Sequence, residues 1–167
     1  MRLLSSLVLS LPFFFSSARA IGVEPGSIRS LVTFGDSFTD IIYTGDHGTA
    51  WPVYTASYGN LSLHSYAISG SSCDEKLTPF GDPYFLNQLQ LPLYFNDTQN
   101  NGLKLNPAET LYTLWLGTND VGDFGLLTGK HTEGTTIVQV TQCAVSWVKT
   151  LYESGARNFL FQNVSSV

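Results

Sequence analysis

The sequence predicts an α/β domain in which short parallel strands alternate with amphipathic helices. Four apolar, β-prone runs are each bounded by turn residues, and two longer segments carry apolar residues at helical spacing. Apolar strands separated by such helices are typical of a parallel sheet with helices on its faces. In these sheets, reactive groups collect beyond the carboxyl ends of the strands.

Four strands and two helices are expected. The strands are expected over residues 31–34, 61–67, 110–116 and 158–164, and the helices over residues 84–94 and 135–152. Pro92 is expected to limit the first helix, and Gly155 is a stop signal after the second. The buried stripe of the second helix is expected to comprise Ile137, Val140, Ala144, Trp147, Val148 and Leu151. The run Phe159-Leu160-Phe161 is typical of a strand buried on both faces.

Size and composition limit the function classes. The chain has 167 residues, of which 43% are hydrophobic and 13% are charged, so it is long enough for one domain and unlike disordered or fibrous chains. Lys and Arg number 8 against 13 for Asp and Glu. This acidic balance argues against a nucleic-acid partner. Two cysteines are too few for a thiolate zinc site, and no metal or cofactor is expected.

The first 20 residues have the pattern of a secretory signal peptide. Arg2 precedes an apolar run, and the segment closes on Ala-Arg-Ala, which fits the A-x-A cleavage pattern. The apolar run is too short to span a bilayer, and a buried N-terminal helix is the alternative. We therefore expect a secreted, extracellular protein that begins near Ile21, with residues 21–167 forming one domain and no stable membrane insertion.

Secretion bears on the two cysteines and on three asparagines. In an oxidising compartment Cys73 and Cys143 are free to pair, because no other thiol competes for them; two buried free thiols are the alternative. Asn60, Asn96 and Asn163 each begin an Asn-x-Ser/Thr tripeptide, which accepts a glycan if it is exposed. Such tripeptides are common by chance and support secretion only weakly.

The first chemical motif is Gly35-Asp36-Ser37, which directly follows a predicted strand. A serine on a tight turn into a helix exposes its hydroxyl, and its own backbone N–H becomes a donor for a developing oxyanion. The alternative is that Ser37 only caps a helix N-terminus, which is a common role for serine.

Two further motifs follow the next two strands. Gly70 allows close backbone approach to a ligand and offers a second N–H donor, although a plain turn glycine is the alternative. In Gly117-Thr118-Asn119-Asp120, the Asn119 amide offers a neutral donor, although an Asx turn is the alternative. Ser, Gly and Asn after successive strands, in this order, form a more specific pattern than any one motif.

These three blocks resemble those of the GDSL or SGNH hydrolases. The flanking residues, including Trp51-Pro52-Val53-Tyr54, are similar to those of fungal secreted acetylesterases of carbohydrate esterase family 16, and the resemblance covers residues 30–164. It implies a flavodoxin-like three-layer α/β/α SGNH-hydrolase fold with a mainly parallel sheet. It also implies a GDSL-type serine esterase that deacetylates carbohydrates and acts, as a monomer, on a small-molecule or oligosaccharide ester.

The resemblance also implies roles for five residues. Ser37 is the nucleophile, and the oxyanion hole comprises the Ser37 N–H, the Gly70 N–H and the Asn119 side chain. Asp36 and Asp120 are supporting residues that brace their loops. For Asp40, Trp51 and Tyr54, near the first block, substrate contact competes with packing or turn capping.

The family's catalytic base is the one part without a counterpart. The family places Asp-x-x-His late in the chain, and none of His47, His64 and His131 has an Asp three residues before it. We therefore expect a C-terminally truncated domain whose sheet is incomplete. We expect this chain to be inactive or nearly so, because a serine hydroxyl is a poor nucleophile without a base in hydrogen-bond reach. Two alternatives stay open, namely a GDSL lipase or acyltransferase on lipid esters, and a non-catalytic secreted carbohydrate-binding protein.

Overall fold

The computed structural model describes residues 22–44, 47–79 and 84–163. Within them, four parallel strands form one sheet in the order β2-β1-β3-β4. The strands are β1 (Ser30–Gly35), β2 (Ser62–Ser65), β3 (Thr110–Trp115) and β4 (Asn158–Phe161). The helical elements are α1 (Trp51–Gly59), the π-helical turn η1 (Leu86–Gln90), α2 (Leu91–Gln99), α3 (Thr118–Val121), the 3-10 turn η2 (Leu126–Thr128) and α4 (Ile137–Glu153).

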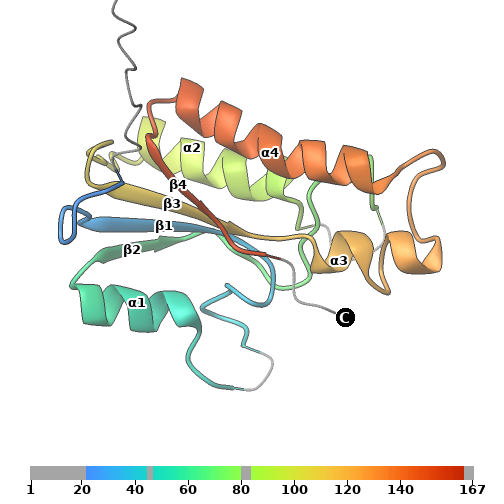
Figure 1. The fold of residues 1–167 in the computed structure, drawn as a ribbon, viewed down its shortest axis with the longest axis horizontal. Coiled ribbons are helices and arrows are strands. Elements are labelled where there is room, and N and C mark those ends of the chain that lie inside the picture. The colour runs from blue at the N-terminus through green and yellow to red at the C-terminus, as the bar shows by residue number, and fades with distance from the viewer. Residues whose placement is uncertain (1–21, 45–46, 80–83, 164–167) are drawn as a thin grey trace, which may run out of the picture.

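The elements form three layers. Figure 1 shows α1 on one face of the sheet and α2 and α4 on the other. The predicted α/β class with a parallel sheet is therefore confirmed, and the two predicted helices and four predicted strands are all present.

The core lies between the sheet and the layer of α2 and α4. Phe34 is fully buried on β1, and its ring centroid lies 5.5 Å from that of Tyr66, 5.7 Å from Tyr94 and 5.6 Å from Trp147. Burial of a large apolar side chain contributes about 1.5–3 kcal/mol, and a well-oriented aromatic pair adds about 0.5–1.5 kcal/mol. These aromatic contacts set how closely α2 and α4 pack on β1 and β3.

Helix α4 follows its predicted pattern with one exception. Val140, Trp147 and Leu151 are buried, and Ala144 and Val148 are partly buried against the core. Ile137 is 54% exposed and does not belong to the stripe, because it lies in the first turn, which projects past the sheet.

Three expectations about the other elements need correction. Pro92 does not limit the helix around it, because it lies in the first turn of α2, where its missing N–H leaves no hydrogen bond unmade. The sequence patterns did not predict α1, which buries only Pro52 and Ala56 and therefore shows little apolar periodicity. The β4 run is not buried on both faces, since Leu160 is 44% and Phe161 is 46% exposed.

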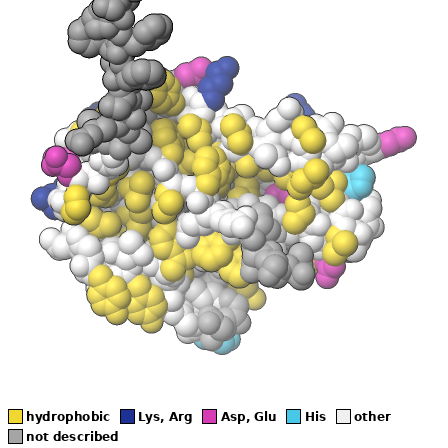
Figure 2. All heavy atoms as spheres, in the orientation of Figure 1, with side chains coloured by type: hydrophobic (Ala, Val, Ile, Leu, Met, Phe, Trp, Pro, Cys, Tyr) yellow, Lys and Arg dark blue, Asp and Glu magenta, His cyan; other side chains and the backbone are white. Residues whose placement is uncertain are grey.

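Apolar side chains gather on the face of the molecule that carries β4, as Figure 2 shows. Those exposed on β4 and α4 are Ile137, Val138, Val145, Tyr152, Leu160 and Phe161. The predicted signal peptide, residues 1–20, and Ile21 lie outside the described residues. In the described part of the chain, no helix is both long and apolar enough to cross a membrane.

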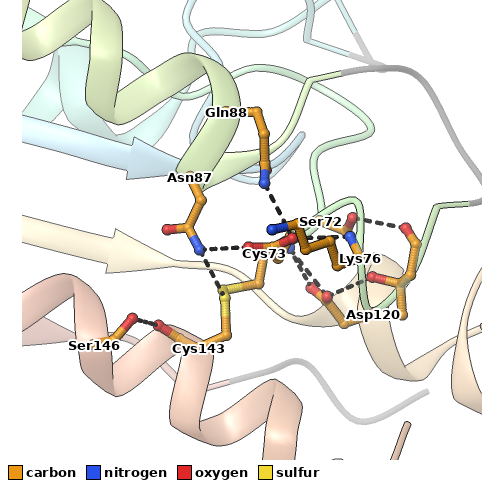
Figure 3. The surroundings of a disulfide bond; sticks show 10 residues. Ser72, Cys73, Lys76, Asn87, Gln88, Asp120, Cys143 and Ser146 are labelled. Carbon is orange, nitrogen blue, oxygen red and sulfur yellow. Dashed lines mark hydrogen bonds between the residues drawn. A yellow bond between two sulfur atoms is a disulfide. The ribbon is translucent and has the colours of Figure 1, made fainter. Parts of the chain in front are cut away.

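Cys73 and Cys143 form a disulfide that joins the loop after β2 to α4. Their Cα atoms are 6.2 Å apart, and the bond closes a loop across 70 positions of the sequence. Figure 3 shows the disulfide beside Asn87, whose Nδ2 lies 3.4 Å from the Cys143 sulfur. The alternative of two free thiols does not hold for this pair.

Replacing both cysteines by alanine should lower the free energy of unfolding by up to about 4 kcal/mol, because the unfolded chain regains the freedom that the cross-link removes. Urea unfolding of the oxidised protein and of the Cys73→Ala/Cys143→Ala variant measures the difference. Reductant serves as the matched control. It should bring the unsubstituted protein down to the stability of the variant and leave the variant unchanged, and an unsubstituted protein indifferent to reductant would contradict the account.

Candidate active site

The three predicted motifs all lie beyond the carboxyl ends of the strands, at the same end of the sheet. Gly35 pairs with Trp115 across β1 and β3, and the Asp36 N–H donates to the Trp115 carbonyl at 3.2 Å. Beyond the end of β2 the chain stays beside β1, because the Ile68 N–H donates to the Gly35 carbonyl at 3.2 Å. The segments 36–37, 68–71 and 117–119 are thereby held together beyond the carboxyl ends of β1, β2 and β3.

Gly35 is required for this close approach. Its φ is +149°, and a Cβ at this position would lie 2.3 Å from the Trp115 carbonyl oxygen. Any side chain would push apart the two strands that carry the first and third motifs. Gly70 has a φ of +81°, which also favours glycine, and it turns the second segment back toward the first.

Ser37 is exposed on a tight turn. Both the Thr39 N–H and the Asp40 N–H donate to the Asp36 carbonyl, at 2.9 and 3.0 Å, which closes the turn. Neither the N–H nor the hydroxyl of Ser37 has a hydrogen-bond partner among the described residues, so both are available to a ligand. The expected helix after Ser37 is absent, and with it the helix N-cap alternative, because the turn ends after one round of hydrogen bonds and the next helix begins at Trp51.

Asn119 faces the second segment. It lies in α3, immediately after β3, and its Nδ2 donates to the Ser71 carbonyl at 2.8 Å. An amide nitrogen carries two hydrogens, so one remains for a ligand after this bond. The Asn119 amide is therefore bonded to the residue that follows Gly70. The Gly70 N–H has no hydrogen-bond partner within the described ranges.

Two buried carboxyls lie behind these groups. Burial and, to a smaller extent, the nearby negative charge of Asp120 raise the pKa of Asp36 to about 6, although the Phe38 N–H that donates to its Oδ1 acts in the opposite direction. Asp36 Oδ2 is buried without a partner in the described structure. Burial also raises the pKa of Asp120, although the Cys73 N–H and the Thr78 hydroxyl donate to its carboxyl.

These contacts show how each carboxyl is used. Asp36 holds the turn that carries Ser37 through the Phe38 N–H, and Asp120 ties the loop after Gly70 to α3 (Figure 3). Both arrangements are consistent with the supporting roles that the resemblance implies.

Three residues near the first motif, Asp40, Trp51 and Tyr54, were expected either to contact substrate or to pack and cap turns. Asp40 is 4% exposed, and its carboxyl accepts from the N–H groups of Ile42, Tyr43 and Ser69, so it caps the turn and also holds the Gly70 segment. Trp51 Nε1 donates to the Thr39 hydroxyl at 3.3 Å. Tyr54 is 49% exposed on α1.

The sequence motifs missed Gln90, which is fully buried and bonds to both Gly35 and Ser71. A signal for it existed. Gln90 lies four residues from both Leu86 and Tyr94, which are buried, so an amide stands on an otherwise apolar stripe. A polar side chain in such a position needs buried hydrogen-bond partners.

No described histidine contacts Ser37. His64 lies in β2 opposite Val32, where burial lowers its pKa against the opposing charge of Asp97. His131 is partly buried and its Nδ1 lies 3.0 Å from the Thr132 carbonyl, whereas His47 is exposed in the loop before α1. Among the described residues, no group of three His, Cys, Asp or Glu side chains could hold a metal ion.

A mainly apolar pocket of about 410 Å³ adjoins the third motif, because Gly117 and Asp120 contribute to its lining. It is enclosed by α3, α4 and the end of β4, with Leu116, Val140 and Phe161 in its wall. Ser37, Gly70 and Asn119 do not line it.

Comparison with known proteins gives concordant matches. A family model described as GDSL-like lipase/acylhydrolase matches residues 31–165. An acetylesterase of Hypocrea jecorina is 26% identical over 189 aligned positions, which cover 93% of this chain and 54% of that protein. An acetylesterase of Thermothelomyces thermophilus is 22% identical, covering 91% of this chain and 58% of that protein.

A solved carbohydrate esterase, described as having an active site with divergent catalytic and non-catalytic binding functions, is similar at a TM-score of 0.47 and 19% identity. The match covers 80% of this chain and 47% of that one. The chain thus spans about half the length of the curated relatives that it matches.

The raised pKa of Asp36 makes a prediction about stability. Between the ordinary value of 3.8 and about 6, the folded protein binds more protons at Asp36 than the unfolded chain does, so this carboxyl destabilises the fold as pH rises through that window. Asp36→Asn removes the titration and keeps an acceptor for the Phe38 N–H. The stability of the variant relative to the unsubstituted protein should therefore increase between pH 4 and pH 7, by up to about 3 kcal/mol.

Urea unfolding at several pH values measures this difference, and Asp74→Asn provides a control of opposite sign. Although burial raises the pKa of Asp74, hydrogen bonds from Asn87, the Lys76 N–H and Gln88 lower it overall. The relative stability of Asp74→Asn should therefore fall as pH rises through the region below about pH 4, and change little between pH 4 and pH 7. A pH-independent difference for Asp36→Asn would show that Asp36 has the same pKa in the folded and unfolded protein, and would contradict the raised pKa.

Proposed function

The chain belongs to the GDSL-like lipase/acylhydrolase family, and from this premise we propose that it contributes the nucleophile and the oxyanion hole of a serine esterase. The observation that carries the proposal is the exposed turn of Ser37, whose hydroxyl and N–H lack partners among the described residues and which is held beside the Gly70 segment and Asn119. The two acetylesterase relatives support the same chemistry.

The proposed mechanism uses each group once. The Ser37 hydroxyl oxygen attacks the ester carbonyl carbon while a base takes its proton, and the carbonyl oxygen becomes an oxyanion. The N–H groups of Ser37 and Gly70 and the free hydrogen of the Asn119 amide bind that oxyanion. The oxyanion then collapses, the alcohol leaves with a proton, and water releases the acid from Ser37.

We propose that removal of the Ser37 hydroxyl proton is the slow step of ester hydrolysis by the 167-residue chain. No described histidine is in contact with Ser37, and a serine hydroxyl is a weak nucleophile when no base accepts its proton. An oxyanion hole without a complete triad can retain about 10³-fold acceleration over water. We therefore propose weak but measurable ester hydrolysis by this chain, which an external base accelerates.

Acetyl groups on carbohydrates are the proposed substrate class. Two relatives are acetylesterases, and the chain exposes the apolar side chains of Phe38, Ile42 and Tyr43 within six residues of Ser37. Phe38 stacks on Trp115 with ring centroids 5.2 Å apart, so part of this apolar rim is rigid. Apolar and aromatic rims of this kind suit the faces of a sugar ring.

We also propose that the protein is secreted as a glycoprotein. Asn60, Asn96 and Asn163 are all exposed, as acceptors of a glycan must be. The disulfide between Cys73 and Cys143 is typical of a protein that matures in an oxidising compartment.

Hydrolysis of p-nitrophenyl acetate in the presence of added imidazole tests the nucleophile. The unsubstituted chain should be faster than Ser37→Ala at every imidazole concentration, because only the former can form an acyl-enzyme. Ser57→Ala, which removes an exposed hydroxyl on α1, is the matched control and should retain the full rate. Equal rates for the unsubstituted chain and Ser37→Ala would reject Ser37 as the nucleophile.

The same assay tests Asn119. Asn119→Ala should lower the Ser37-dependent rate by about 10²-fold, because one donor to the oxyanion is lost. Asn100→Ala, at the exposed end of α2, controls for loss of an asparagine and should leave the rate unchanged. A normal rate for Asn119→Ala would remove this amide from the oxyanion hole.

A further inference from the structure

Gln90 is a polar side chain placed entirely inside the core. It is 0% exposed and is the last residue of η1, directly before α2. Burying an amide is unfavourable unless hydrogen bonds replace those it made to water. The position therefore depends on the partners that the fold supplies.

Those partners belong to the first two site segments. Gln90 Oε1 accepts from the Gly35 N–H at 3.0 Å, and its Nε2 donates to the Gly35 carbonyl and to the Ser71 hydroxyl, each at 2.8 Å. Three of the four hydrogen-bonding positions of the amide are occupied.

At Gly35 the amide does the work of a neighbouring strand. The β1–β2 pairing ends at Thr33 and Ser65, two residues before Gly35. There the Gln90 side chain accepts from the Gly35 N–H, as a paired strand residue does, and it also donates to the Gly35 carbonyl, which the Ile68 N–H shares. It thus extends the support of β1 to its last residue, two positions before Ser37.

The Ser71 contact connects the same amide to the rest of the site. Ser71 follows Gly70, and its carbonyl accepts from the Asn119 amide at 2.8 Å. The element that carries Gln90 is itself bound to this loop, because the Leu86 N–H donates to the Ser72 carbonyl at 3.0 Å. One buried network therefore joins Gly35, Ser71 and Asn119, each within two residues of a proposed oxyanion donor or providing one.

We propose that Gln90 is a positioning residue, which sets the distance between the Ser37 turn and the Gly70 N–H and so assembles the oxyanion hole. The proposal rests on the proposed function for its catalytic consequence. Its structural content, that one buried amide couples the Gly35–Ser37 and Gly70–Ser71 segments, is testable without any activity.

The chain offers a matched control two residues away. Gln88 is exposed, and its Nε2 donates only to Asp74 Oδ1, at 3.0 Å. Gln88→Met and Gln90→Met make the same chemical change in the same element. They differ in whether the amide reaches the site.

Amide hydrogen exchange is measured on the folded 167-residue chain and on Gln90→Met, Ser71→Ala and Gln88→Met. Gln90→Met should accelerate exchange by about 10-fold or more at the hydrogen-bonded amides of both segments, namely those of Gly35 and Asp36 and those of Ile68 and Ser71, because the Gly35 N–H loses its acceptor and the second segment loses its tie to the first. The amides of β3 should keep their rates. Gln88→Met should change neither segment.

Ser71→Ala keeps the test decisive if Gln90→Met does not fold. This variant removes one hydroxyl and breaks only the Gln90–Ser71 hydrogen bond. Ser71 does not contact Gly35 directly, so the faster exchange that we expect at Gly35 in this variant would have to be transmitted through the Gln90 amide. Uniform acceleration over the whole sheet, or no coupled change in the two segments, would overturn the proposal.

A second readout separates positioning from folding. In the imidazole-assisted assay, kcat should fall by about 10-fold or more in Gln90→Met while KM changes little, because a displaced donor weakens binding of the transition state more than that of the ester. A rise in KM with kcat unchanged would contradict a role of Gln90 in the oxyanion hole. If no Ser37-dependent rate exists at all, the proposed function fails, and the exchange experiment still decides whether Gln90 couples the segments.

Discussion

The direct pairing of β1 with β3 is the constraint on which the site depends. Strand order β2-β1-β3 means that the chain moves to one side of β1 for the second strand and to the other side for the third. The first connection runs through α1 on one face, and the second runs through α2 on the opposite face (Figure 1). Loops that diverge in this way leave a crevice beyond the carboxyl ends of the two central strands, where α/β proteins bind ligands. Ser37 and Asn119 follow these two strands, Ser37 after β1 and Asn119 after β3.

Buried polar contacts hold these loops in place, since helices do not. The Ser37 turn is followed by irregular chain, and α3 has only four residues. Gln90, Asp40 and Asp120 instead supply side-chain acceptors and donors to backbone groups of the loops. Asp36 and Asp120 are both fully buried behind the serine, and burial raises the pKa of each. Hydrogen bonds to an oxyanion are stronger in such surroundings than in water.

Much of the fold followed from local patterns, and much of the site did not. Strand-length apolar runs and the period of α4 were sufficient to predict the sheet and its covering helices. Strand β2 was predicted near its true place, but the helix before it, α1, was not predicted, because a helix that buries two residues has almost no apolar period. The three motifs predicted Ser37, Gly70 and Asn119 as neighbours, since parallel strands end at one edge. Gln90 was missed because its partners are 55 and 19 residues away and no local pattern specifies them.

The most direct test of the shared oxyanion hole is an NMR titration of the ¹⁵N-labelled chain with methylboronic acid, which adds to a reactive serine as a tetrahedral anion. The account predicts that the Ser37 N–H, the Gly70 N–H and the Asn119 side-chain amide shift together along one binding curve, and that Ser37→Ala abolishes the shifts. Shifts confined to other residues, or an Asn119 amide that stays unchanged while Ser37 binds boronate, would contradict it.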